Sequence, residues 1–155
     1  TRLYFKDCYI DGTTDFIFGP STALFENCMI HSKRNSYVTA ASTPKEAKYG
    51  YIFKHCKLTA EPGVDKVYLG RPWRPYAYTL FIECELGKHI VPAGWHNWDK
   101  QSNEETARYM EYKNTGEGAN VSERVAWSKQ LTKKEAEAVT VDAIFGTQSN
   151  WNPID

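Results

Sequence analysis

Two short segments carry residue types that could together do chemistry on a protein surface. Residues 12–19 are apolar apart from one charge, Asp15, and residues 69–73 hold Arg71 and Trp73 two positions apart. A carboxylate that an arginine keeps ionised is a possible nucleophile. A tryptophan beside it is a possible platform for a sugar ring. From spacing alone an external salt bridge beside a packed tryptophan remains the alternative.

A repeat relates the two segments to each other. The pattern Phe-x-x-Cys-x-(Ile/Leu) occurs four times, at spacings of 20, 28 and 28 residues, and it contains all four cysteines of the chain; it begins at Phe5, Phe25, Phe53 and Phe81. Repeats of this length indicate a solenoid. The spacers are rich in Gly, Pro, β-branched and aromatic residues and lack a helical period, which favours coils built of strands.

The position of the two charged residues in the repeat predicts that they meet. Asp15 precedes Phe25 by ten residues, and Arg71 precedes Phe81 by ten residues. We therefore expect both in one column on one face, two rungs apart, or roughly 9.6 Å between backbones. An extended arginine can span most of that distance. The intervening rung, residues 37–43, has small residues that leave it room.

Strand alternation predicts which side chains of these segments face outward. If Phe16 and Phe18 face the core, Asp15 faces out. Arg71 and Trp73 then share its face.

The repeat also defines the expected architecture, an all-β parallel β-helix in a single domain over residues 1–155. Residues 1–86 form the repeat coils, and residues 87–155 form the last coil and a C-terminal cap. Residues 132–139 predict a short helix with Thr132 and Glu135 as a capping box and Leu131 as its staple. Residues 102–112 are ambiguous between a helix capped by Ser102 and an edge strand. The chain starts directly in a strand pattern without Met, so we expect N-terminal coils to be missing.

The four cysteines are predicted to be free and stacked inside the solenoid. Small buried residues in one interior row explain their fixed phase better than disulfides do. A zinc site is less favoured, because no Cys-x-x-Cys pair occurs. The four histidines do not pair with Ser or Cys in a motif, so we interpret them as structural: His31, His55, His89 and His96.

Composition narrows the class of function. Lys plus Arg and Asp plus Glu number 19 each, and zero net charge argues against a nucleic-acid partner. No apolar run approaches the roughly 20 residues of a membrane span, and no signal peptide is visible. Aromatic residues make up 14% of the chain, which suits both a core and sugar stacking.

Two motifs of the sequence resemble those of a known family. Residues 12–19 (GTTDFIFG) and 69–73 (LGRPW) resemble the two signatures of the pectin methylesterases, and the resemblance continues through residues 94–95, 111–119 and 124–127. It implies a right-handed parallel β-helix without metal or cofactor. It also implies a secreted, extracellular or periplasmic protein, expected to be a monomer, that acts on methyl-esterified homogalacturonan.

The resemblance assigns roles residue by residue. Asp15 matches the nucleophile, which attacks the methyl ester of a galacturonate unit and releases methanol. Arg71 matches its orienting partner, and Trp73 matches the stacking tryptophan. Phe18 lines the cleft in some relatives, although alternation places it inward, and Trp95 either borders the cleft or caps the solenoid.

The chain departs from the family pattern in two places. Thr14 and Pro20 stand where many members have Val and Asn. The general acid of the family lies in a Gln-Asp-Thr motif one coil upstream, and its glutamine helps to form the oxyanion hole; no Gln-Asp occurs here. A non-catalytic binding module or an inactive homologue is therefore the rival hypothesis. Other β-helix enzymes fit less well, because calcium-dependent lyases need acidic clusters and glycosidases need paired carboxylates.

Overall fold

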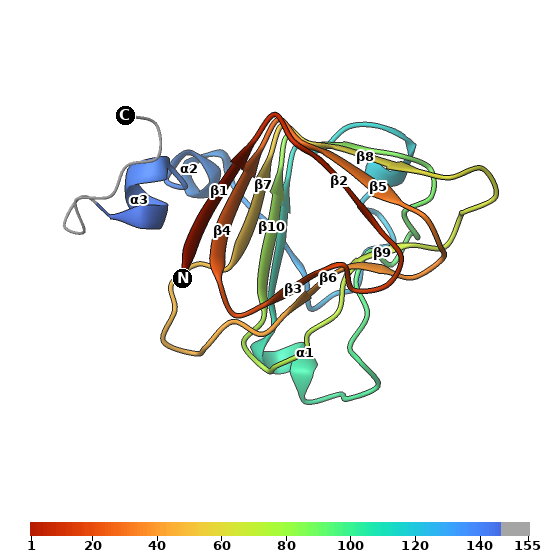
Figure 1. The fold of residues 1–155 in the computed structure, drawn as a ribbon. Helices are drawn as coiled ribbons and strands as arrows, with labels where there is room; N and C mark the ends of the chain where they lie inside the picture. The colour runs from red at the N-terminus through yellow and green to blue at the C-terminus, as the bar shows by residue number, and fades with distance from the viewer. Residues whose placement is uncertain (147–155) are drawn as a thin grey trace.

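The computed structural model describes residues 1–146, whose strands form three parallel sheets stacked around one axis (Figure 1). Sheet A contains β1 (Arg2–Lys6), β4 (Thr22–Glu26), β7 (Tyr51–Lys54), β10 (Tyr78–Ile82), β12 (Arg108–Tyr112) and β13 (Lys129–Gln130). Sheet B contains β2 (Tyr9–Gly12), β5 (Met29–Ser32), β8 (Lys57–Ala60) and β11 (Glu85–Leu86). Sheet C contains β3 (Ile17–Gly19), β6 (Tyr37–Ala41) and β9 (Tyr68–Gly70). The predicted parallel β-helix is confirmed.

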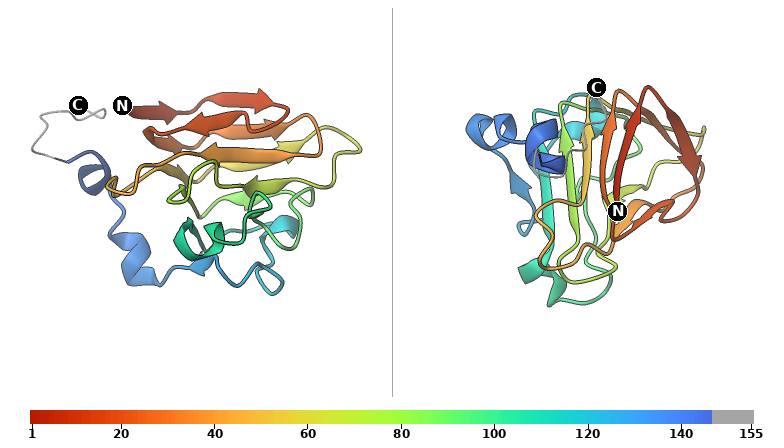
Figure 2. Two further views of the ribbon diagram at one scale, coloured as in Figure 1. Left: turned by 90° about the horizontal axis from the view of Figure 1, so that it is seen from below. Right: turned by 60° about the vertical axis from the view of Figure 1, so that its left-hand side comes forward.

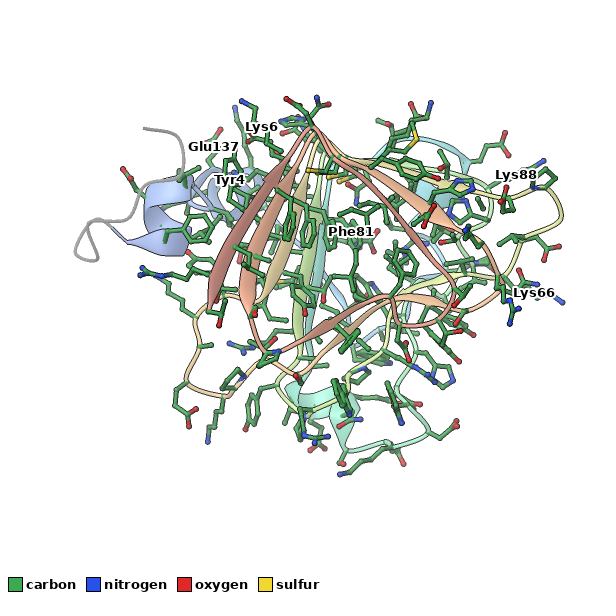
Figure 3. All side chains as sticks on the ribbon, viewed as in Figure 1. Tyr4, Lys6, Lys66, Phe81, Lys88 and Glu137 are labelled. Carbon is green, nitrogen blue, oxygen red and sulfur yellow. The ribbon has the colours of Figure 1, made fainter. Side chains whose placement is uncertain are left out.

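The phenylalanines of the repeat form a continuous stack inside the solenoid. Phe5, Phe25, Phe53 and Phe81 occupy one register position of sheet A. Successive ring centroids lie 4.9, 4.5 and 4.5 Å apart with nearly parallel planes. Figure 3 shows Phe81 pointing into the interior between the sheets. Because each coil supplies the same ring, apolar burial and aromatic stacking hold all coils in a single register.

The corner between sheets A and B is one residue in the left-handed conformation. The residue before each repeat cysteine has a positive φ: Asp7 (56°), Asn27 (52°), His55 (53°) and Glu83 (49°). Lys113, one coil later, also has a positive φ. None of these residues is β-branched, which fits a conformation that β-branched side chains avoid.

The repeat cysteines are free, as predicted. The Sγ atoms of Cys28, Cys56 and Cys84 each lie 3.4–3.5 Å from the carbonyl oxygen of the repeat phenylalanine one coil earlier. These three thiols are buried, whereas Cys8 in the first coil is half-buried. Burial raises the pKa of Cys28 to about 11 and that of Cys84 well above the ordinary thiol value.

A buried ion pair ends the aromatic stack. Glu111 takes the register position that follows Phe81 and is 1% exposed. Its two carboxylate oxygens accept hydrogen bonds from Nε and Nη2 of Arg124, at 2.9 and 3.1 Å. Arg124 Nη2 also donates to the Gly118 carbonyl at 2.7 Å. The last coil therefore closes the interior with a neutralised charge pair in place of a fifth ring.

The C-terminal segment divides into two parts with different positions. Trp95, Tyr109 and Trp127 pack at the end of the interior and close it. Helices α2 (Lys133–Glu137) and α3 (Val141–Phe145) instead lie along the outer face of sheet A (Figures 1 and 2). Lys54 Nζ on β7 donates a hydrogen bond to the Val139 carbonyl between them.

The helix predictions at the C-terminus have mixed outcomes. The capping box of Thr132 and Glu135 at the start of α2 is confirmed, and Leu131 packs in the apolar cluster beneath it. The ambiguity at residues 102–112 resolves into both alternatives, because helix α1 (Asn103–Thr106) precedes strand β12. Ser102 occupies the N-cap position of α1 but its side chain makes no capping bond.

The thiol stack generates a first prediction. Denatured, unreduced protein should yield four titratable thiols, because no described cysteine is bonded to another. In the native protein a thiol reagent should label Cys8 first, since Cys28, Cys56 and Cys84 are 0–2% exposed. Finding no free thiol in the denatured protein would contradict the stack.

The buried ion pair generates a second prediction. Glu111→Leu should destabilise the protein by about 3–5 kcal/mol, because it leaves the Arg124 charge buried without its partner. The double variant Glu111→Leu/Arg124→Leu should be less destabilised than the sum of the two single variants. Urea unfolding followed by circular dichroism measures all three. Strict additivity would show that the pair does not interact.

Candidate active site

Asp15 sits at a turn between sheets B and C. Its φ of 48° is left-handed, and its backbone N–H donates to the Tyr37 carbonyl of the next coil at 2.9 Å. Gly12 permits this turn, since a Cβ there would lie 2.3 Å from Cβ of Phe16. Asp15 therefore precedes β3. The sequence had suggested that Asp15 lies within a strand, which was wrong. An aspartate tolerates this strained conformation better than a bulky residue would.

The predicted contact between Asp15 and Arg71 is confirmed. Arg71 Nε donates to Asp15 Oδ1 at 3.1 Å, and Nη2 donates to Oδ2 at 2.7 Å. This two-point geometry fixes the plane of the carboxylate as well as its charge. The two side chains are 19% and 21% exposed, so the pair is accessible from outside the solenoid.

The register predicted for this contact was wrong. Arg71 directly follows Gly70, which aligns with Thr39, so Arg71 is level with Ala40 and Phe18 rather than with Asp15. The shared offset of ten residues fails because the sheet C to sheet A connection has two residues after β3 and seven after β9. Arg71 reaches Asp15 diagonally across the middle rung, where its guanidinium group lies over the Tyr37 ring.

Two aromatic rings hold the guanidinium group in place. Its Cζ lies 3.9 Å from the ring centroid of Tyr37 and 3.9 Å from that of Trp98. Burial lowers the pKa of Arg71, but the hydrogen bonds and charge of Asp15 more than offset this, so that its pKa lies above the ordinary arginine value. The group is a permanent cation with little freedom to turn, which is what orienting a carboxylate requires.

The carboxylate lies at the wall of a surface cavity of about 390 Å³ with an aromatic lining. Phe18 and Trp73 form one side of it, 63% and 41% exposed, with ring centroids 5.9 Å apart. Trp98 and Ala40 contribute further wall. Polar chemistry at Asp15 beside flat apolar faces is an arrangement that suits a sugar ring.

The prediction that Phe18 faces the core was wrong. In β3, Ile17 and Gly19 are buried and Phe18 points outward. The left-handed turn at Asp15 shifts the alternation by one residue, so that Asp15 and Phe18 share a face although they are three residues apart. The placement of Phe18 thereby agrees with its expected position at the cleft.

Trp95 cannot border the cleft. It is 1% exposed, stacks on Tyr109 with centroids 4.3 Å apart, and its Nε1 faces Glu111 Oε2 at 3.4 Å. Trp95 pairs with Gly70 of the preceding coil, which is a buried position, so Trp95 continues the interior row. The structure supports the capping alternative and corrects the substrate-contact interpretation.

Tyr37 and Trp98 were not predicted from the sequence as site residues. Both contact Arg71, but neither has a charge, and neither belongs to the repeated Phe-x-x-Cys positions that marked the coils in the sequence. The aromatic turn at residues 94–98 contains both Trp95 and Trp98, but only Trp95 was predicted as a candidate site residue.

No group of three or more His, Cys, Asp or Glu side chains within residues 1–146 is arranged to hold a metal ion. Over the same residues, no helix is long and apolar enough to cross a membrane.

These features define a parallel β-helix protein with an aspartate–arginine site in an aromatic cavity on its outer face. Residues 1–148 match the family model described as Pectinesterase. The chain belongs to the pectinesterase family.

Individual relatives agree with the family match. The chain is 43% identical over 136 residues to Pectinesterase 31 of Arabidopsis thaliana, covering 87% of this chain and 43% of that relative. It superposes on pectin methylesterase from carrot with a TM-score of 0.87 at 34% identity, covering 95% of this chain and 51% of the carrot chain. A pectin methylesterase in complex with a hexasaccharide matches at a TM-score of 0.84 and 33% identity, over 98% of this chain and 52% of that one. The chain thus spans about half the length of the relatives it matches.

Proposed function

We propose that this chain carries the nucleophilic half of a site that removes methyl esters from galacturonate units of pectin. The observation that carries the proposal is the two-point bond from Arg71 to Asp15 beside an aromatic cavity. Arg71 presents a charged carboxylate in a fixed orientation, and Trp73 and Phe18 offer faces for the sugar. Family membership and the hexasaccharide complex of a relative support a polysaccharide ligand.

In the proposed reaction, an Asp15 oxygen bonds to the carbonyl carbon of the methyl ester. The bond from that carbon to the methoxy oxygen breaks, and the methoxy group takes a proton and leaves as methanol. Water then attacks the acyl–Asp15 anhydride, which releases the galacturonic acid and restores the carboxylate. Arg71 keeps Asp15 charged and oriented in both steps.

The proton for methanol and the donors for the developing oxyanion have to come from other groups. The chain has three glutamines and no Gln-Asp pair. Gln130 Nε2 faces Glu111 in the interior at 3.3 Å, Gln101 lies in the exposed turn before α1, and Gln148 is outside the described residues. By resemblance to the family, these groups are expected in a segment preceding this one.

A non-catalytic pectin-binding module is the second candidate. The aromatic cavity favours it, because stacking on Trp73 needs no general acid. A secreted location, extracellular or periplasmic, belongs to both proposals, since pectin is a polysaccharide of cell walls.

The first test is the activity of the chain by itself. The purified 155-residue protein should release little or no methanol from methylated pectin, because loss of one oxyanion donor alone costs about 10²–10³ in rate. Full turnover by the isolated chain would show that the proposed division of the site is wrong.

The second test places Asp15 in a complete site. In a hybrid that joins the preceding half of the carrot enzyme to these residues, methanol release should be restored. Asp15→Asn should abolish it without unfolding the protein, because the residue lies outside the core. Arg71→Lys should also impair it strongly, since a point charge replaces a two-point donor.

A control separates this effect from a general loss of charge. Asp11→Asn removes a carboxylate of the outer face of sheet B, where Asp11 is 4.0 Å from Lys33, and should leave methanol release unchanged. Circular dichroism confirms the fold of each variant. A folded Asp15→Asn hybrid with near-normal turnover would place the nucleophile elsewhere and favour the binding module.

The third test measures sugar binding by the chain itself. Trp73→Ala should weaken its affinity for a methyl-esterified oligogalacturonide, measured by calorimetry, because the ring offers the largest exposed indole face at the cavity. Tyr9→Ala is the matched control, since Tyr9 is 59% exposed but lies on sheet B away from the cavity. Equal losses in both variants would argue against a platform at Trp73.

A further inference from the structure

Tyr37 and Trp98, which hold the guanidinium group of Arg71 between them, are here called the Arg71 clamp. We propose that His96 is a positioning residue that makes this clamp sensitive to pH. Neutral His96 holds Tyr37 and Trp98 in place around the guanidinium group, and protonation of its Nδ1 atom loosens this hold. The effect on catalysis rests on the proposed function of Asp15, whereas the effect on Arg71 does not.

His96 contacts the ring of Tyr37 and the backbone of Trp98. Its Nδ1 accepts a hydrogen bond from the backbone N–H of Trp98 at 3.0 Å. Its ring meets the Tyr37 ring at 5.6 Å between centroids and 63° between planes.

The segment that carries Trp98 needs this support. Trp98 and Asp99 are consecutive residues with left-handed φ, 60° and 53°. This conformation is unfavourable for residues with a Cβ atom. It is fixed by two hydrogen bonds, from Trp98 N–H to His96 and from Asp99 N–H to Asn97 Oδ1 at 2.8 Å. Loss of the first bond removes the direct tie on the tryptophan that faces Arg71.

The protonation state of His96 decides whether that bond exists. A neutral imidazole has one acceptor nitrogen, while both nitrogens of the protonated ring are donors. Protonated Nδ1 would point a hydrogen at the Trp98 N–H, so the ring or the loop has to move. The backbone of His96 is itself anchored, because its N–H donates to the Gly70 carbonyl at 3.1 Å. We therefore expect the loop at Trp98 to give way.

The charged and titratable groups around His96 come from three segments. Asp99 Oδ1 on its own loop is 3.9 Å from Nε2. Tyr37 on β6 and Tyr68 on β9 face the ring with their edges or faces at 5.6 and 5.3 Å. Behind Tyr37 lies the Arg71 cation.

Two variants separate the acceptor from the ring. His96→Asn places a carbonyl oxygen where Nδ1 lies and cannot be protonated, so it keeps the bond to Trp98 at every pH. His96→Phe keeps an aromatic ring beside Tyr37 and Tyr68 but has no acceptor. Nuclear magnetic resonance of the 155-residue chain reports on the clamp through the Arg71 Nε–H signal, which is observable when that proton is held by Asp15.

The expected result differs among the three proteins. In the unmodified chain the Arg71 Nε–H signal should be lost on acidification, with the same midpoint as the His96 ring titration. In His96→Asn the signal should persist through that midpoint and be lost only when Asp15 itself is protonated. In His96→Phe it should be weak or absent at all pH values.

Two results would overturn the proposal. One is loss of the Arg71 signal at the same pH in the unmodified chain and in His96→Asn, which would assign the change to Asp15. The other is a mismatch between the His96 and Arg71 midpoints in the unmodified chain, which needs no variant to fold. The experiment involves no ester, so its failure leaves the role of Asp15 untouched, and an inactive hybrid would leave the role of His96 untouched.

Discussion

The two-point hydrogen bond between Asp15 and Arg71 is the interaction on which the site depends. Its partners come from coils two rungs apart, so it can form only if the stack beneath it is rigid and in register. The Phe5 to Phe81 stack supplies that register, with ring spacings of 4.5–4.9 Å. Gly12 supplies the space for the turn at Asp15, where a Cβ atom would collide with Phe16.

The chain uses the same ion-pair geometry twice, with opposite surroundings. Glu111 and Arg124 are 1% and 3% exposed, and their pair neutralises charge at the end of the interior. Asp15 and Arg71 are about one-fifth exposed and open onto a cavity. Partly exposed pairs contribute little to stability, roughly 0–1 kcal/mol. Holding a carboxylate in a strained backbone position beside solvent is therefore better explained by chemistry than by folding.

Much of the fold could be predicted because a solenoid repeats its interior residues at recognisable intervals. The Phe and Cys rows predicted the coils and the free thiols. Features that depend on loop length or on one backbone torsion could not be predicted in the same way. The connection after β9 is longer than that after β3, which displaced Arg71 by three positions from the expected column. One left-handed residue reversed the facing of Phe18. Tyr37 and Trp98 lie outside the repeated Phe-x-x-Cys positions, so no recurring spacing marks their contact with Arg71.

The most direct test of the account is a crystal structure of the chain with a methyl-esterified oligogalacturonide. If Asp15 is the nucleophile, a sugar ring should lie against Trp73 and Phe18, with the ester carbonyl carbon of one unit about 3–3.5 Å from an Asp15 oxygen. Arg71 should keep both hydrogen bonds to Asp15 in that complex. A ligand bound on another face, or one whose ester points away from Asp15 while its ring occupies the cavity, would contradict the claim that this carboxylate is the nucleophile.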